Sequence, residues 1–410
     1  MTQNASPAGR TAQAPPMDPP PDRAAPPSTA RLAGVDLARG LAVLGMYAAH
    51  VGPDPSDGGP VGFLMELSHG RASALFAFLA GFSLLLITGR RTPRTGRAGR
   101  QAVTRILIRS AVLLPLGTAL TMTGTPVDVI LAFYALYFVL ALPLRGLRAG
   151  TLAVIAAVGA LVLPQVLYLI QRSIRTGDWA PAVLHHDPLA RISGTGGFLE
   201  LLFTGAYPVL TWMPFVIAGM AVARLDLASA AVRLRLALTG GALTVLGYGG
   251  SWLALHLLPG AADAIGATGT TGSVMSLWWS DTAGDPSGGT SAWLLVASPH
   301  SETTLSILGG TGVAVTVLAA CVAAADGLPR VRRLARPVIA IGAMSLTAYV
   351  LNIVGIWALG IEDVPGSPLP VLLGFIAAAA LLALAWSRHF RRGPLEYLLN
   401  SATKAARLVP

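Results

Sequence analysis

Long apolar runs separated by short polar gaps dominate the chain. A helix needs about 20 mainly apolar residues to cross the hydrocarbon core of a bilayer, and ten runs come close to that length. They are residues 33–52, 70–89, 102–122, 126–144, 151–170, 203–223, 235–258, 303–325, 337–359 and 368–387. The pattern predicts an all-α fold, a polytopic transmembrane bundle of about ten spans.

The polar gaps carry a strong charge asymmetry. Arginines concentrate in alternate gaps and after the last run, at positions 90–105, 145–148, 224–235, 330–336 and 388–407. Cytoplasmic loops carry an excess of basic residues, so an even number of spans with both termini in the cytoplasm fits this alternation. We divide the chain into a disordered cytoplasmic tail (1–30), a first transmembrane half (31–230), a C-terminal transmembrane half (231–400) and a cytoplasmic tail (401–410).

Composition narrows the function further. Of the 410 residues 53% are hydrophobic and only 12% charged, and the net charge is +10. Because the basic residues lie in short gaps between spans, we interpret them as topology signals and expect no nucleic-acid partner. The only cysteine, Cys321, lies in an apolar run. We also read His185, His186 and Asp187 as a solvated loop, so we expect no metal site.

The first apolar run contains three ionisable residues, Asp36, Arg39 and His50. Charged groups in the hydrocarbon region are costly and usually line a cavity or pathway. At about 100° per residue the three share one helix face, with His50 about 16 Å along the axis from Arg39. We expect Asp36 to pair with Arg39 and His50 to act as a base or transient acyl acceptor. The alternative is a structural ion pair with His50 turned toward the outer surface.

Further polar candidates lie at the outer ends of other spans. His69 and Arg71 enter the second run and could surround a developing oxyanion, or merely anchor the helix. Tyr207 and Trp212 could stack on a sugar ring, or belong to the interfacial aromatic belt. His300 precedes Ser and Thr residues suited to capping the eighth span. We name these five as candidate acceptor-binding residues.

The first run also resembles a known family. An arginine followed by ten residues and a histidine in the first span is the arrangement of the transmembrane acyltransferase superfamily, and the whole run resembles bacterial relatives of heparan-alpha-glucosaminide N-acetyltransferase, including YeiB-like proteins. Four further stretches support this resemblance: SHGRASALFAFLAGFSLLL (68–86), TGAYPVLTWMPFVIAGMAVARLDL (204–227), SPHSETTLSILGGTGVAV (298–315) and AIGAMSLTAYVLNIVGIWALG (340–360). The last resembles a C-terminal domain of unknown function found in the same proteins. Bacterial relatives often have a histidine where this chain has Asn352, which weakens a role for that position.

The resemblance implies a plasma-membrane enzyme that takes an acyl group, most simply acetyl, from cytoplasmic acyl-CoA and delivers it to an extracytoplasmic acceptor. The implied partners are membrane lipids, acyl-CoA and a glycan or small-molecule acceptor, and a homodimer is left open. The arginines between positions 90 and 109 are mainly topology signals and lipid-phosphate contacts. One or two of them could instead hold the phosphates of coenzyme A, and the sequence does not indicate which. Two alternatives remain. The protein could be a transporter or export permease that uses the helix face of Asp36, Arg39 and His50, which we call the polar stripe, or a non-catalytic partner of envelope-assembly enzymes.

Overall fold

Helices are the only regular elements among residues 2, 29–270, 272–280, 289–390 and 392–410, which the computed structural model describes. This confirms the predicted all-α class. Each predicted apolar run overlaps a long helix or a consecutive pair of helices. The predicted N-terminal tail, apart from its last two residues and residue 2, lies outside the described residues. The helices of the bundle are α1 (Thr29–Val51), α3 (Arg71–Thr88), α4 (Gly96–Thr121), α5 (Leu131–Ala141), α6 (Ala149–Thr176), α10 (Val209–Ala223), α11 (Ala230–Thr244), α12 (Gly250–Leu257), α14 (Thr304–Gly327), α16 (Arg336–Ala343), α17 (Ser345–Leu359) and α18 (Leu369–Ser387).

Within the described residues, six helical segments are long and apolar enough to cross a membrane. Two bent pairs, Gly197–Thr204 with α10 and α16 with α17, raise this number to eight if each pair is one span. The chain is therefore a membrane protein. The predicted ten spans and the cytoplasmic position of both termini stay predictions. Of the two remaining predicted runs, one matches the short apolar segment Leu131–Gly146 and the other matches α1, which carries the polar stripe.

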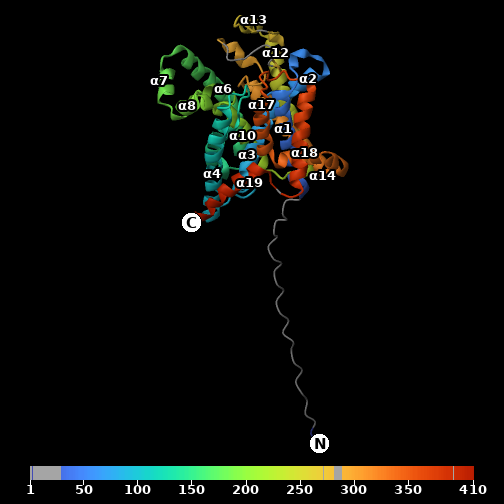
Figure 1. The fold of residues 1–410 in the computed structure, drawn as a ribbon. Coiled ribbons are helices and arrows are strands. Elements are labelled where there is room, and N and C mark those ends of the chain that lie inside the picture. The colour runs from blue at the N-terminus through green and yellow to red at the C-terminus, as the bar shows by residue number, and fades with distance from the viewer. Residues whose placement is uncertain (1, 3–28, 271, 281–288, 391) are drawn as a thin grey trace.

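Helices α1 and α3 form the centre of the bundle (Figure 1). Helix α1 packs against α3, α14 and α16, and α3 packs against α10. Glycines permit these close approaches: a Cβ atom added at Gly81 of α3 would overlap the backbone of Val216, and one at Gly219 of α10 would overlap the backbone of Phe78. Small residues let transmembrane helices approach in this way. The crossing fixes α3, whose first residue is the candidate Arg71.

The break between α16 and α17 is a bend of 88°. Glu396 of the short helix α19 (Pro394–Ala402) caps the second helix, since its carboxylate accepts hydrogen bonds from the backbone N–H groups of Leu346 (2.7 Å) and Thr347 (3.2 Å). These N–H groups have no partner inside the helix. The Glu396 cap thus fixes the start of α17, and with it the position of Asn352 along the helix axis two turns later.

Arginines gather at one end of the bundle, which we call the arginine-rich end. It lies at the lower end of Figure 1, with α19 and the C-terminus. There Arg90 donates to the carbonyls of Ala223 and Leu225, and Arg224 donates to those of Gly89 and Arg90. Residues 401–410, which we took for a tail, include a short helical segment (Thr403–Leu408), and Arg100 of α4 donates to the carbonyl of Pro410 at 2.9 Å.

Short helices cover the opposite end, where the sequence shows only long polar gaps. They are α2 (Gly59–Ser68), α7 (Trp179–His186), α8 (Pro188–Ser193), α9 (Gly197–Leu199) and α13 (Ala261–Gly266). Asp187 accepts hydrogen bonds from the N–H groups of Leu189 and Ala190, so it caps α8. We call the described parts of 258–303 the outer cap. The cap has a small core of its own, which Leu277, Trp293 and Val296 form with Leu255 of α12 and Ile265.

Candidate functional site

Asp36 and Arg39 form the predicted ion pair, with Arg39 Nη1 2.8 Å from Asp36 Oδ1. The guanidinium also donates to Ser83 Oγ of α3 (3.0 Å) and to the carbonyl of Gly342 in α16 (3.4 Å). Both charged side chains keep about a quarter or less of their surface exposed. A charge so poorly hydrated needs partners. The pair therefore joins α1, α3 and α16 and places a partly neutralised guanidinium at a fixed position.

Arg39 lines a cavity of about 300 Å³, which we call the inner cavity. Its polar lining includes Ser83, Arg109 of α4, Tyr134 of α5 and Glu396, and the remaining walls are mainly apolar. Glu396 belongs to α19 at the arginine-rich end, whereas Tyr134 lies in the first turn of α5 and stacks on Phe76 of α3. The cavity therefore reaches from the arginine-rich end deep into the bundle. Of its lining residues, the sequence pointed to Arg39 and, as one of the arginines between positions 90 and 109, to Arg109.

His50 lies beyond the inner cavity, near the outer end of α1. Its ring is buried, and Nδ1 lies 2.7 Å from Oδ1 of Asn352 in α17, a residue that is 1% exposed. An amide oxygen only accepts hydrogen bonds, so in this arrangement the Nδ1–H of His50 donates to it. The lone pair of the imidazole then lies on Nε2, the nitrogen that a general base uses.

Asn352 is the partner that the sequence reasoning missed. We regarded the position as weakened because it is not a histidine, yet its amide sets the tautomer of His50 in the structure. The only available signal was a polar residue inside an apolar run. The contact joins residues 302 positions apart, so no local pattern reveals it.

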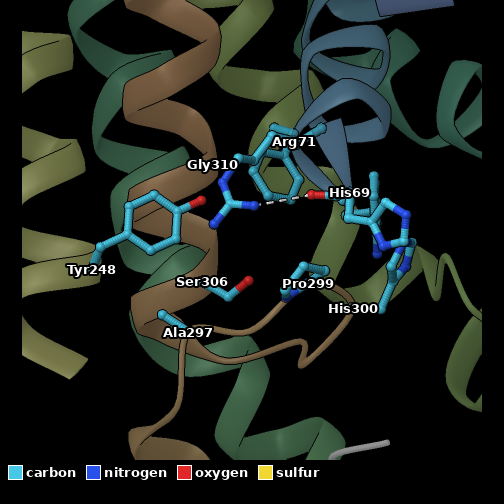
Figure 2. Close-up of a pocket in the computed structure, with 12 residues that line it drawn as sticks. His69, Arg71, Tyr248, Ala297, Pro299, His300, Ser306 and Gly310 are labelled. Atoms are coloured by element: carbon cyan, nitrogen blue, oxygen red, sulfur yellow. Dashed lines mark hydrogen bonds between the residues drawn. The ribbon is translucent and has the colours of Figure 1, made fainter. Parts of the chain in front are cut away.

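Four of the five outer candidates line one small cavity, which Figure 2 shows. His69, Arg71, Trp212 and His300 surround it, together with Tyr248 of the π-helical turn between α11 and α12. Its volume is about 20 Å³, which is room for about one water molecule. We call it the outer cavity. In this conformation it is closed to any sugar.

Arg71 spans this cavity and holds the outer cap. It donates to the backbone carbonyls of Glu66 (2.8 Å) and Trp279 (2.5 Å) and more weakly to that of His69 (3.4 Å), the dashed line of Figure 2. Its guanidinium also lies 4.9 Å from the ring centre of Tyr248. A cation over an aromatic face is stabilised electrostatically. Arg71 thus connects α2, α3, the π-helical turn between α11 and α12, and the outer cap.

His300 is held in a strained position. Its φ is +54°, a left-handed conformation that non-glycine residues rarely adopt and that is often kept at functional sites. Because Nδ1 donates to the carbonyl of Ala206 (3.0 Å), the lone pair again lies on Nε2. His69 and His300 are both close enough to His50 to interact with it electrostatically. Three histidines therefore gather at the outer end of the bundle.

Tyr207 and Trp212 hold His300 from two sides. Their ring centres lie 5.2 Å and 5.8 Å from its imidazole, and both side chains are buried. An interfacial belt would place these rings at the lipid headgroups, and burial rules that position out for both. Trp212 donates from Nε1 to Glu302 (2.8 Å), a carboxylate the sequence analysis did not select. Trp212 lines the outer cavity. Tyr207 does not line the cavity but packs against His300, which does.

Comparison with protein families divides the chain into two matched parts. Residues 31–254, more than half of the chain, match the catalytic domain of heparan-alpha-glucosaminide N-acetyltransferase. Residues 274–406 match a protein family of unknown function, DUF418. No curated protein and no solved structure matches the chain. The first match contains seven of the eight candidate residues, and His300 lies in the second.

Proposed function

The chain belongs to the family of the heparan-alpha-glucosaminide N-acetyltransferase catalytic domain, and from this premise we propose that it transfers an acyl group, most simply acetyl, across the membrane. The donor is coenzyme A thioester on the cytoplasmic side, which we equate with the arginine-rich end. The acceptor is an amine or hydroxyl on the extracytoplasmic side, on a glycan or small molecule. We assign the protein to the plasma membrane.

The observation that carries this proposal is the order of groups along the bundle. The inner cavity comes first, lined by Arg39, by Arg109 and by Glu396 of the arginine-rich end. His50 follows, and the outer cavity with His69 and His300 comes last. A donor carrying phosphates suits cationic surroundings at the mouth of the cavity. Arg90 and Arg224 are occupied by backbone carbonyls, so Arg109 is the better candidate for a phosphate contact.

His50 is the proposed general base. Its Nε2 accepts the proton of the acceptor O–H or N–H as the acceptor atom forms a bond to the acyl carbon. The carbon–sulfur bond then breaks, and the departing thiolate receives the proton from the imidazolium, so coenzyme A leaves as its thiol. Asn352 holds the required tautomer through the bond to Nδ1. Asp36 partly neutralises the charge of Arg39. Arg39 in turn holds in place the wall of the inner cavity along which the thioester enters.

The outer residues form the proposed acceptor site. The outer cavity is too small for a sugar, so the acceptor enters when the outer cap moves, and Arg71 is the side chain whose bonds to the cap must rearrange. Trp212 and His300 then offer an aromatic face and a ring nitrogen to the incoming molecule. The acceptor of the named relative, an alpha-glucosaminide, makes glucosamine a suitable first probe.

A transporter would use the same stripe as a solute path. The stacked rings of Phe76 and Tyr134 line the inner cavity, and the ring of Tyr349 lies against both Phe76 and His50. Bulky rings at this point favour transfer of a small acyl group over passage of a whole solute.

The test uses purified protein in detergent with labelled acetyl-CoA and glucosamine. His50→Ala should lower the transfer rate about 100-fold or more, the usual contribution of a positioned base. The matched control is His256→Ala, because His256 is exposed at the end of α12, stacks on Trp252 and lines neither cavity. Unchanged transfer by His50→Ala would remove His50 from the mechanism. Absence of transfer by the unmodified protein would contradict the enzyme class.

A further inference from the structure

Tyr134 has a buried hydroxyl without a hydrogen-bond partner among the described residues. The residue is 4% exposed and lines the inner cavity. A buried hydroxyl nearly always has a partner, and each exception needs an explanation. Neighbouring tyrosines follow the rule: Tyr47 donates to the carbonyl of Ala348 and Tyr137 to that of Tyr207, both at 2.7 Å. The oxygen is covered in this conformation, so a ligand in the cavity supplies the missing acceptor when a neighbouring side chain moves aside.

Tyr134 marks the end of the inner cavity that lies nearest His50. Its ring stacks on Phe76 with the ring centres 5.4 Å apart, and Phe76 stacks on Tyr349 at 6.3 Å. The ring of Tyr349 in turn lies 6.4 Å from that of His50. The stacked rings therefore connect the lining of the inner cavity to the base.

The surroundings of Tyr134 select the chemistry of that ligand. Apolar side chains of Phe76, Leu79 and Leu131 line the cavity beside it. Of the two arginines that line the cavity, Arg39 already has a carboxylate, a hydroxyl and a carbonyl as partners. A fully charged ligand group would therefore be poorly stabilised beside Tyr134. A short apolar chain that ends in an uncharged carbonyl fits both the walls and the single donor.

We propose, on the basis of the acyl transfer proposed above, that the Tyr134 hydroxyl binds the carbonyl oxygen of the donor thioester. The phenol donates to this oxygen in the bound thioester and to the oxyanion that forms when the acceptor attacks the acyl carbon. The proton stays on the tyrosine throughout, and the negative charge returns to the carbonyl as the carbon–sulfur bond breaks. A fixed donor in a water-excluded site stabilises the transition state more than the ground state. Tyr134 is thus a catalytic residue that contacts the reacting group.

Tyr134→Phe is the variant that tests this assignment, because it removes one oxygen that makes no bond within the described protein. The matched control is Tyr47→Phe, which removes a buried phenol oxygen from a tyrosine outside the inner cavity. We expect Tyr134→Phe to lower kcat about 100-fold, as the loss of one oxyanion donor does, with KM for acetyl-CoA changed far less. Tyr47→Phe should retain kcat, and thermal unfolding of both variants shows whether either is misfolded.

Infrared difference spectra supply a second measurement, which a change in packing alone would not alter. With carbonyl-labelled acetyl-CoA bound to the unmodified protein, the thioester C=O stretch should shift to lower frequency, because a hydrogen bond weakens the double bond. The shift should vanish in Tyr134→Phe and persist in Tyr47→Phe. Coenzyme A itself, which lacks the acyl carbonyl, should bind Tyr134→Phe as tightly as the unmodified protein.

The outcomes separate the two proposals. If the unmodified protein binds and transfers acetyl but Tyr134→Phe keeps both its kcat and the spectral shift, the assignment of Tyr134 is wrong and the acyltransferase proposal stands. If the unmodified protein neither binds acetyl-CoA nor transfers acetyl, both proposals are wrong.

Discussion

Replacement of Asn352 by alanine should slow the reaction without removing the base. The hydrogen bond between His50 Nδ1 and Asn352 Oδ1 is 2.7 Å long, and its two side chains are 8% and 1% exposed. Loss of the amide leaves a buried imidazole N–H without its acceptor, which costs about 1–3 kcal/mol. If that energy holds the tautomer and ring angle needed for catalysis, kcat should fall by about 5-fold to 150-fold.

Steady-state rates of acetyl transfer to glucosamine, measured on protein of verified thermal stability, check this value. Asn352→Asp should retain more activity than Asn352→Ala, because a carboxylate oxygen can also accept from Nδ1–H. Leu351→Ala, at the half-exposed neighbouring position on α17, is the control for general disturbance of this helix. A kcat within twofold of the unmodified protein in Asn352→Ala would refute the positioning role. Equal losses in Leu351→Ala would assign the effect to helix packing.

Two further predictions concern the scaffold. Gly219→Ala should prevent close packing of α3 on α10, since its Cβ would overlap the backbone of Phe78, and should lower the yield of monodisperse protein. Gly241→Ala, whose added Cβ meets no atom within 4 Å, should be tolerated, so equal behaviour of the two in size-exclusion chromatography would contradict the packing argument. Glu396→Ala should remove the N-terminal cap of α17 and cost about 1–2 kcal/mol of stability, measured by thermal unfolding. Glu396→Gln, which retains an acceptor oxygen, should lose less, and the reverse order would reject the cap.

Local patterns predicted the helical framework well. Apolar length alone located the long helices, and the spacing of three residues between Asp36 and Arg39 predicted their ion pair, which the structure contains. The pattern could not reveal the right-angled bend between α16 and α17. That bend depends on Glu396, about 50 residues later in the chain, whose carboxylate caps the second helix.

The candidate site was only partly visible in the sequence. Polar residues at the ends of apolar runs pointed to His69, Arg71 and His300, which do meet at one cavity. Their roles in binding and catalysis remain predictions. Asn352 and Tyr134 were missed because their importance depends on tertiary contacts: one accepts from a histidine on a distant helix, and the other lacks an acceptor that a tyrosine normally finds. No periodicity in one sequence encodes either fact.

The central claim is that an acyl group passes through the bundle from the inner cavity, past His50, to an acceptor on the opposite side. The most direct measurement uses sealed vesicles that contain oriented protein, with labelled acetyl-CoA only at the arginine-rich face and glucosamine only at the other. The account predicts labelled N-acetylglucosamine on the glucosamine side, lost in His50→Ala and retained in His256→Ala. Product that forms only when both substrates share one side, or that forms equally in His50→Ala, would contradict it.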